Sequence, residues 1–123
     1  MQSALDAIHE YYRAFSTLDL SAIVSYFCEQ SMTIAGQGVF SAANRGTLAD
    51  SLAPLVQSLR AKGYGRSEFV DAQVTMLGES DALVRGVAVR YTAAGPELER
   101  VRLSYLMHRS DVGWKIAVLV AES

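Results

Sequence analysis

The stretch HEYYRAFSTLDLSAIVSYF, residues 9–27, decides how this chain folds. Apolar and aromatic side chains recur at spacings of three and four from Leu5 to Leu18. This period places them on one face of a helix, and no glycine or proline interrupts the run. Asp19 or Ser21 then offers an N-cap for a second, shorter helix, which we expect to carry Ile23 to Phe27.

A strand, a turn and a second strand are expected after these helices. Met32 to Phe40 carries apolar residues on both sides of Gly36-Gln37-Gly38, which is the pattern of a short hairpin. Helical spacing returns between about Thr47 and Lys62, so we expect a third helix there, ended by Gly63. Pro54 either kinks this helix or marks a later start, in its first turn.

Four segments in the second half of the chain have the composition of strands. They are rich in β-branched and aromatic residues and are separated by short turns; they are Glu68 to Leu77, Ala82 to Thr92, Glu99 to Arg109 and Trp114 to Val120. Strands joined by short turns form an antiparallel meander. Helices followed by strands predict an α+β fold, in a single domain over residues 1–123, rather than a βαβ fold.

Composition and charge restrict the class of protein. Of the 123 residues, 50% are hydrophobic and 20% are charged, the balance of one globular domain. The net charge of -2 provides no basic field, so we expect neither nucleic acid nor a membrane as a partner. The lone cysteine, Cys28, fits a reducing compartment, and the first residues lack the pattern of a signal peptide. We therefore expect a cytoplasmic protein with no cofactor.

Both faces of the predicted sheet carry apolar side chains. In Ala82 to Thr92, one alternating row holds Leu83, Val87, Val89 and Tyr91, and the other holds Val84 and Ala88. Only one row can face the helices, and large apolar patches are uncommon on the surfaces of monomers. We expect a homodimer through the outer sheet face. The arginines of the strands are expected to extend across that face or to pair across the dimer: Arg85, Arg90, Arg100, Arg102 and Arg109. An inward Arg85 or Arg102 would instead favour an anionic ligand.

The quoted stretch resembles the opening of the nuclear transport factor 2-like proteins. It has an aromatic pair, Tyr11 and Tyr12, then Asp19 before the second helix and Phe27 eight residues later. Two further segments match, Asn44-Arg45-Gly46-Thr47 and Gly113-Trp114-Lys115-Ile116, so the resemblance covers nearly the whole chain. It implies a cone-shaped fold of the SnoaL-like and ketosteroid-isomerase-like branch, with N-terminal helices packed on a curved antiparallel sheet. That superfamily includes isomerases, polyketide cyclases, dehydratases and non-catalytic association domains, so the fold leaves the activity open.

The resemblance allows the isomerase chemistry to be tested residue by residue. Tyr11 lies where ketosteroid isomerases place an oxyanion-hole tyrosine, but the position of their catalytic base falls on Ala35, which cannot abstract a proton. No carboxylate lies near Ser104 to Leu106, where the second acid is required. Ketosteroid isomerase activity is therefore not expected, and no histidine has the spacing of a metal ligand.

An apolar cavity inside the cone is the candidate ligand site. The closing strand, from Ile116 to Val120, is wholly apolar. The residues expected to line the cavity are Tyr11, Tyr12, Phe15, Phe27, Ile34, Tyr105 and Leu119. Each of the paired tyrosines either packs in the core with its hydroxyl satisfied or donates a hydrogen bond to a ligand. Asp71 is the carboxylate that could face the cavity as a base, although the mixed polarity of its row also fits an exposed position.

Three functions remain open from the sequence. The first is a domain that binds a small hydrophobic molecule without transforming it. The second is a polyketide-cyclase-like isomerase or lyase, with Tyr11 or Tyr12 as the donor and Asp71 as the base. The third is a dimeric association module whose cone is filled by side chains.

Overall fold

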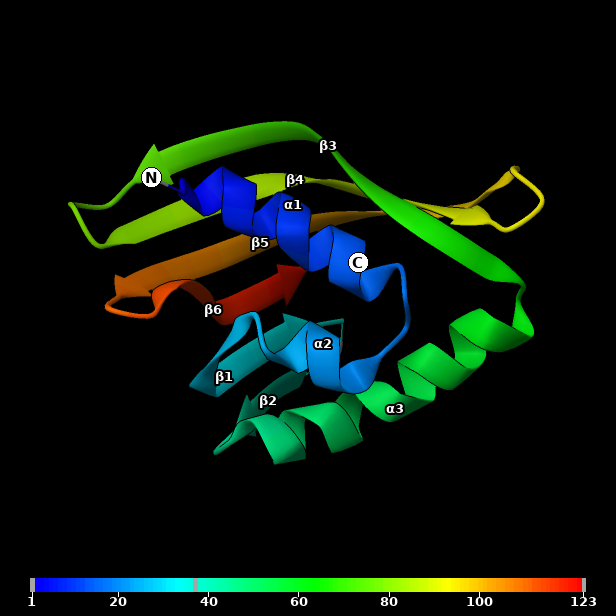
Figure 1. The fold of residues 1–123 in the computed structure, drawn as a ribbon, viewed down its shortest axis with the longest axis horizontal. Helices are drawn as coiled ribbons and strands as arrows, with labels where there is room; N and C mark the ends of the chain where they lie inside the picture. The colour runs from blue at the N-terminus through cyan, green and yellow to red at the C-terminus, as the bar shows by residue number, and fades with distance from the viewer. Residues whose placement is uncertain (1, 37, 123) are drawn as a thin grey trace.

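A computed structural model describes residues 2–36 and 38–122 of the chain. Figure 1 shows helices lying on one side of a curved sheet, which confirms the predicted α+β cone. The elements in chain order are α1 (Ala4–Phe15), α2 (Leu20–Val24), β1 (Phe27–Ala35), β2 (Gly38–Ala42), α3 (Arg45–Ala61), β3 (Tyr64–Met76), β4 (Asp81–Thr92), β5 (Glu97–Ser110) and β6 (Gly113–Ala121). Gln37, in the middle of the expected hairpin turn, lies outside the described residues.

The two opening helices begin at side-chain caps. Ser3 and Asp6 form a reciprocal capping box at the start of α1. The Asp19 carboxylate accepts hydrogen bonds from the amides of Ser21 and Ala22, at 3.0 and 3.5 Å, and so begins α2. The second helix ends at Val24, earlier than the apolar spacing predicted. Phe27 instead begins β1, because the chain is already joined to the sheet by the hydrogen bond from the Ile116 amide to the Tyr26 carbonyl.

Six strands form one sheet in the order β2-β1-β6-β5-β4-β3. The four long strands make the predicted antiparallel meander, and β1 pairs with β2 in an antiparallel hairpin. The pairing of β1 with β6 is parallel, so the sheet as a whole is mixed. The sequence does not indicate this pairing, because β1 and β6 are far apart along the chain and no short turn joins them. β1 and β6 therefore lie side by side in the sheet, although residues 36–112 separate them along the chain.

The third helix contains its proline instead of starting at it. Pro54 lies in the interior of α3, where the missing amide hydrogen leaves the carbonyl of Asp50 without its usual helical partner. The helix bends in its middle in Figure 1, so the kink is the alternative that the structure supports.

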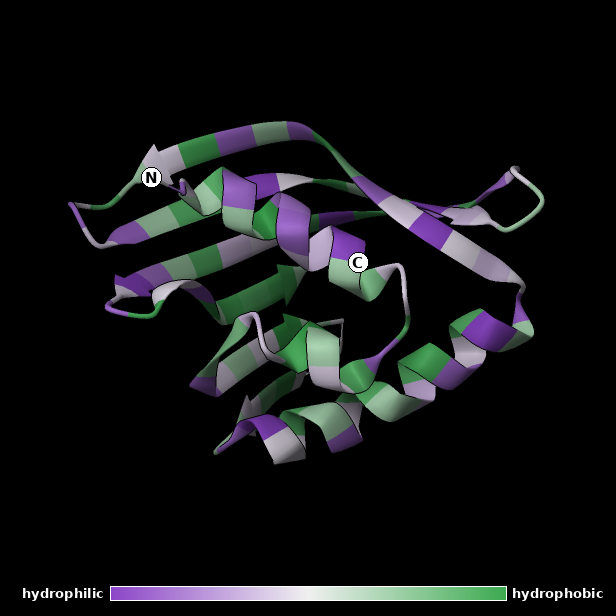
Figure 2. Cartoon of the chain, viewed as in Figure 1, coloured by the Kyte–Doolittle hydropathy of each residue, from purple (hydrophilic) through white to green (hydrophobic). Residues whose placement is uncertain are grey.

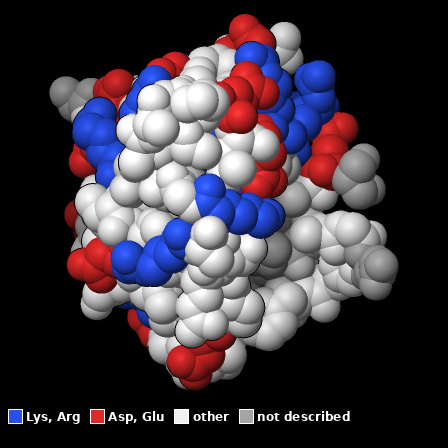
Figure 3. All heavy atoms as spheres, turned by 90° about the vertical axis from the view of Figure 1, so that its right-hand side faces the viewer, with Lys and Arg blue, Asp and Glu red and all other residues white. Residues whose placement is uncertain are grey.

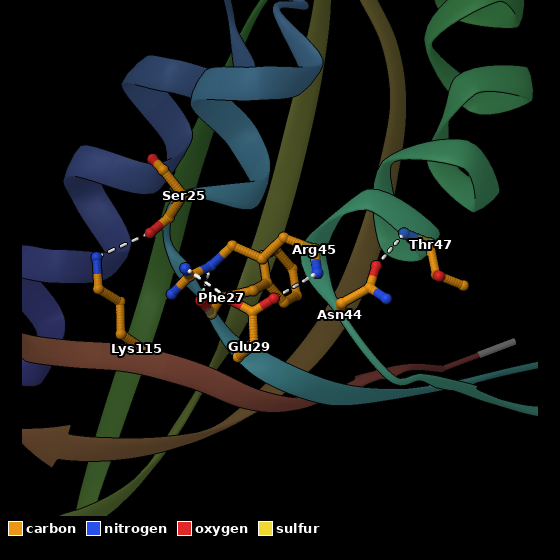
Figure 4. A network of polar contacts seen from close by, with 7 residues as sticks. All are labelled: Ser25, Phe27, Glu29, Asn44, Arg45, Thr47 and Lys115. Atoms are coloured by element: carbon orange, nitrogen blue, oxygen red, sulfur yellow. Dashed lines mark hydrogen bonds and ion pairs between the residues drawn. The ribbon is translucent and has the colours of Figure 1, made fainter.

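The start of α3 is fixed to β1 by Arg45 (Figure 4). Its Nε donates to the carbonyl of Phe27 at 2.9 Å, and a terminal nitrogen meets the Glu29 carboxylate at 3.1 Å. The Asn44 side chain accepts a hydrogen bond from the Thr47 amide at 2.8 Å, which caps the helix. These contacts hold α3 across the end of the cone.

One apolar core lies between the helices and the inner face of the sheet. Figure 2 shows hydrophilic and hydrophobic residues alternating along the strands and sharing the surfaces of the helices. Among the described residues, no helix is both long and apolar enough to cross a membrane.

Candidate functional site

A cavity of about 230 Å³ lies inside the cone, between α1, α3 and the sheet. Most of the side chains in its wall are apolar or aromatic. Six of the residues expected from the sequence line it, namely Tyr11, Tyr12, Phe15, Phe27, Tyr105 and Leu119. Ile34 does not line it: the inward residues of β1 are Thr33 and Ala35, so Ile34 points to the outer face, where 36% of it is exposed.

Three tyrosines gather at one side of the cavity. The ring of Tyr11 lies 5.1 Å from that of Tyr12 and 5.9 Å from that of Tyr105, both with edge-to-face geometry. The hydroxyls of Tyr12 and Tyr105 form a hydrogen bond. Burial raises the pKa of all three phenols above their ordinary range. They are therefore neutral at physiological pH, and the proton of one of the Tyr12 and Tyr105 hydroxyls is used in the bond between them.

Gly86 in β4 leaves space for the ring of Phe69, which packs against the tyrosines. The ring of Phe69 stacks on that of Tyr12, with centroids 5.1 Å apart and planes 15° from parallel. A Cβ atom at Gly86 would lie only 2.5 Å from Cζ of Phe69. Because the glycine has no side chain, Phe69 can lie flat against the sheet and hold the Tyr12 ring in place.

The position of Arg90 differs from the one expected for the arginines of the strands. We predicted it on the outer face, but it lines the cavity, and only 13% of its side chain is exposed. Its guanidinium lies 5.5 Å from the centroid of Phe15 and pairs with the Glu99 carboxylate at 3.3 Å. Arg90 shares its row with Val84 and Ala88, which are buried. The opposite row is richer in apolar residues, so alternation in the sequence did not mark Arg90 as inward.

The apolar stretch of α3 was also absent from the predicted site. Leu48, Leu52 and Leu55 close the cavity on the side opposite the sheet. Their helical spacing was visible, but not the bend that lays α3 across the cone.

Asp71 lies outside the cavity. It is exposed in β3, at an irregularity of the pairing with β4, with a φ of 56°. The side chains near it form a shallow polar depression on the outer face that includes Gln73, Arg85 and Arg102. The structure therefore does not bring Asp71 together with Tyr11, and neither Arg85 nor Arg102 is a cavity residue. Among the described residues that line the cavity, none is an aspartate, glutamate or histidine.

The two histidines and the cysteine lie apart from the cavity. His108 Nδ1 lies 2.8 Å from the Asp81 carboxylate at the surface, and His9 contacts the edge of Phe69. Burial raises the pKa of the Cys28 thiol, which keeps it protonated and a poor nucleophile. Within the described part of the chain, no three metal-binding side chains lie close enough to hold an ion.

Comparison with known proteins agrees with this architecture. The model of a family described as NTF2-like protein (DUF6841) matches residues 2–123. A similar solved structure is an NTF2-like protein with a cystatin-like fold from Novosphingobium aromaticivorans, with a TM-score of 0.77 and 18% identity over 95% of this chain and 77% of that one. None of the curated proteins matches the chain.

Two further solved structures share the fold. An NTF2-like protein of unknown function from Shewanella oneidensis has a TM-score of 0.74 and 19% identity, over 97% of this chain and 95% of that one. A ketosteroid isomerase-like protein from Erwinia carotovora has a TM-score of 0.64 and 17% identity, over 97% of this chain and 92% of that one. At these identities the likeness concerns the fold alone.

Proposed function

We propose a ligand-binding function from the premise that the chain belongs to the NTF2-like protein family DUF6841. In this proposal the cavity holds a small, mainly apolar molecule and does not transform it. The observation that carries the proposal is the cavity itself, whose wall combines apolar side chains with a few polar groups. That combination is typical of binding sites for small molecules.

The volume of the cavity limits the size of the ligand. Sites for drug-sized molecules span about 300–1,000 Å³, whereas an apolar cavity of about 150 Å³ is enough for benzene. The cavity of about 230 Å³ lies between these values. A single ring with a short substituent, or a short branched chain, is the size that fits.

The isomerase or lyase function is the alternative. The neighbour named as ketosteroid isomerase-like motivates it, and Tyr11 could supply a donor. The described wall of the cavity holds no carboxylate or imidazole that could act as the base: Ala35 lies at the expected position, and Asp71 lies on the outer face. Binding without turnover accounts for the cavity and does not require that base.

Association with a second copy through the outer sheet face is a separate proposal. Met32, Ile34 and Val39 are exposed apolar side chains on the outer face of β1 and β2, where Val39 lies directly opposite Ile34. Elsewhere on the outer face, Asp71 lies beside two arginines, so two copies related by a twofold axis could pair opposite charges. Light scattering at micromolar concentration should give a dimeric mass, and Ile34→Lys should lower it. A monomeric mass for the unmodified chain would contradict this proposal.

We also propose a cytoplasmic location, because the single cysteine, Cys28, fits a reducing compartment.

The ligand-binding proposal is tested with a neutral one-ring probe and a filled cavity. Benzene should shift the NMR signals of the tyrosine and phenylalanine side chains of the cavity and raise the melting temperature. Ala121→Leu places a larger side chain in the cavity wall and should abolish both effects. Shifts that persist unchanged in Ala121→Leu would mean that benzene binds elsewhere. No response to either benzene or an anionic one-ring probe would refute the function.

A further inference from the structure

The wall of the apolar cavity contains one positively charged side chain among its described residues. Arg90 extends from β4 into the wall, and its guanidinium lies near the ring of Phe15. A charged group in such surroundings loses most of its hydration, so it requires partners that replace the lost water. The cavity is therefore positively polarised at this point.

The partners that Arg90 has are fewer than its donors. A guanidinium carries five N–H groups, in a fork that can bind a carboxylate through two parallel hydrogen bonds. One terminal nitrogen faces Glu99 at 3.3 Å, and the carboxylate of Glu99 is one-third exposed. Among the described residues, Nε of Arg90 is buried and has no hydrogen-bond partner. A buried donor left unsatisfied costs about 1–3 kcal/mol, so a small rotation of the guanidinium that brings this donor to an acceptor in the cavity would be favoured.

Neutral hydroxyls lie in the same wall as this cation. Arg90 is close enough for its charge to lower the pKa values of Tyr11, Tyr12 and Tyr105, which opposes the larger effect of burial. The phenols remain protonated and can donate, but they carry no charge of their own. Arg90 is the single cationic side chain in the described wall and is already shared with Glu99, so the cavity suits a singly charged carboxylate better than a doubly charged phosphate.

We infer that the ligand of this cavity is a small carboxylic acid bound as its anion. Its carboxylate accepts hydrogen bonds from the unused donors of Arg90, and its apolar ring or chain contacts the aromatic and leucine side chains. This inference rests on the proposed ligand-binding function and specifies the chemical class of the ligand. Glu99 lies directly opposite Arg90 on the neighbouring strand β5 and competes weakly for the guanidinium, because its own side chain remains in contact with solvent.

Benzoate and benzamide are the probes that separate charge from shape. They have the same size and the same ring, and only benzoate is an anion at neutral pH. NMR titration of the unmodified protein should show benzoate binding about 10- to 100-fold more tightly than benzamide, the ratio expected for a charge-assisted hydrogen bond. Equal affinities for the two probes would overturn the inference and leave the ligand-binding function standing. If benzoate, benzamide and benzene all failed to bind, the ligand-binding function itself would be refuted.

Variants assign the preference to Arg90. Arg90→Met keeps an unbranched side chain in the wall and should reduce the preference for benzoate to about onefold. Arg85→Met is the matched control on the outer face and should leave the preference unchanged. Retained benzoate preference in a folded Arg90→Met protein would contradict the inference.

Glu99→Gln provides a test that does not remove the cation. It takes away the competing negative charge, so benzoate affinity should rise about two- to fivefold while benzamide affinity stays constant. A fall in benzoate affinity, or equal changes for both probes, would count against the inference even if Arg90→Met failed to fold.

Discussion

The interior of the cone has a packed end and an open end, built by the same helix and the same strands. At the packed end, Ala82, Met107 and Ile116 are neighbours across β4, β5 and β6, and at most 1% of each is exposed. At the open end, Leu103, Ala121 and Ala35 are neighbours across β5, β6 and β1, and all three line the cavity. The same sheet therefore changes from a filled core to the wall of a cavity along its strands.

The difference comes from side-chain size and from what covers the sheet. At the packed end, α1 presents Ile8, which is fully buried. At the open end, α1 presents Tyr11 and Phe15 and then ends, so the bent α3 closes the remaining space. Close packing is the rule in protein interiors, so the cavity beside small residues such as Ala121 and Thr33 is a departure from that rule, and the proposed ligand-binding function accounts for it.

Truncating a buried side chain should separate the two ends most strongly. Ile116→Ala, at the packed end, should lower the free energy of unfolding by about 2–5 kcal/mol, because it leaves a void that the dense surroundings cannot fill. Leu119→Ala, three residues along the same strand, enlarges an existing cavity and should cost less. Urea unfolding of both variants measures the comparison. Equal losses would mean that the open end is as tightly packed as the other.

Enlarging an alanine should give the opposite pattern. Ala82→Leu forces extra atoms into the packed end and should lower the free energy of unfolding by about 1–3 kcal/mol. Ala121→Leu has cavity space to occupy and should change stability by less than about 1 kcal/mol. Thermal unfolding of the two variants checks this order. Greater destabilisation by Ala121→Leu would show that the cavity does not accept a side chain.

The tyrosine cluster should make the protein sensitive to alkali. The pKa values of Tyr11, Tyr12 and Tyr105 are raised in the folded state, so above pH 10 the unfolded chain ionises first and the folded state binds more protons. The free energy of unfolding is unaffected below about pH 10. It should then fall by about 1.4 kcal/mol per pH unit for each protected phenol.

Tyr12→Phe separates this effect from general alkaline damage. The variant should lose one phenol's share of the slope above pH 10. Urea unfolding at pH 8 and pH 11 measures it, with pH 8 as the reference because the phenols are neutral in both states there. A slope identical to that of the unmodified protein would contradict the assignment.

The smallest effect is expected on the outer face. Asp71→Asn keeps a residue type that tolerates a positive φ and should change stability by less than about 0.5 kcal/mol. Because Asp71 lies outside the cavity, benzoate binding should not change. A clear loss of benzoate binding or of any turnover in Asp71→Asn would mean that Asp71 on the outer face influences the cavity on the inner face.

The fold was largely predictable because local patterns and spatial neighbours coincide in it. The spacing around Asp19 predicted both helices, and the short turns predicted the meander. The end of α2 and the parallel pairing of β1 with β6 were not predictable in the same way. Both depend on contacts between distant residues, such as the hydrogen bond from Ile116 to Tyr26.

The apolar and aromatic residues of the site were predictable from the sequence, and the positions of its charged candidates, Arg90 and Asp71, were not. The resemblance brought Tyr11 and Phe27 to the cavity, but Arg90 was assigned to the surface because arginines are seldom buried. Alternation did not correct this, because the row without Arg90 carries more apolar residues than the row with it. Asp71 could not be placed by alternation, because the irregularity in β3 interrupts the alternation at that residue.

The parallel pairing of β1 with β6 also sets the order in which the cavity wall can be assembled. Thr33 of β1 lies beside Leu119 of β6, so the two halves of this wall are made far apart in time during synthesis. Contacts of such separation close late, after the local helices and hairpins have formed. The nascent protein must therefore keep β1 unpaired on that side, and its apolar wall uncovered, until the ribosome has released β6. Pulse-labelled hydrogen exchange during refolding should show that the amides hydrogen-bonded between β1 and β6 become protected from exchange late.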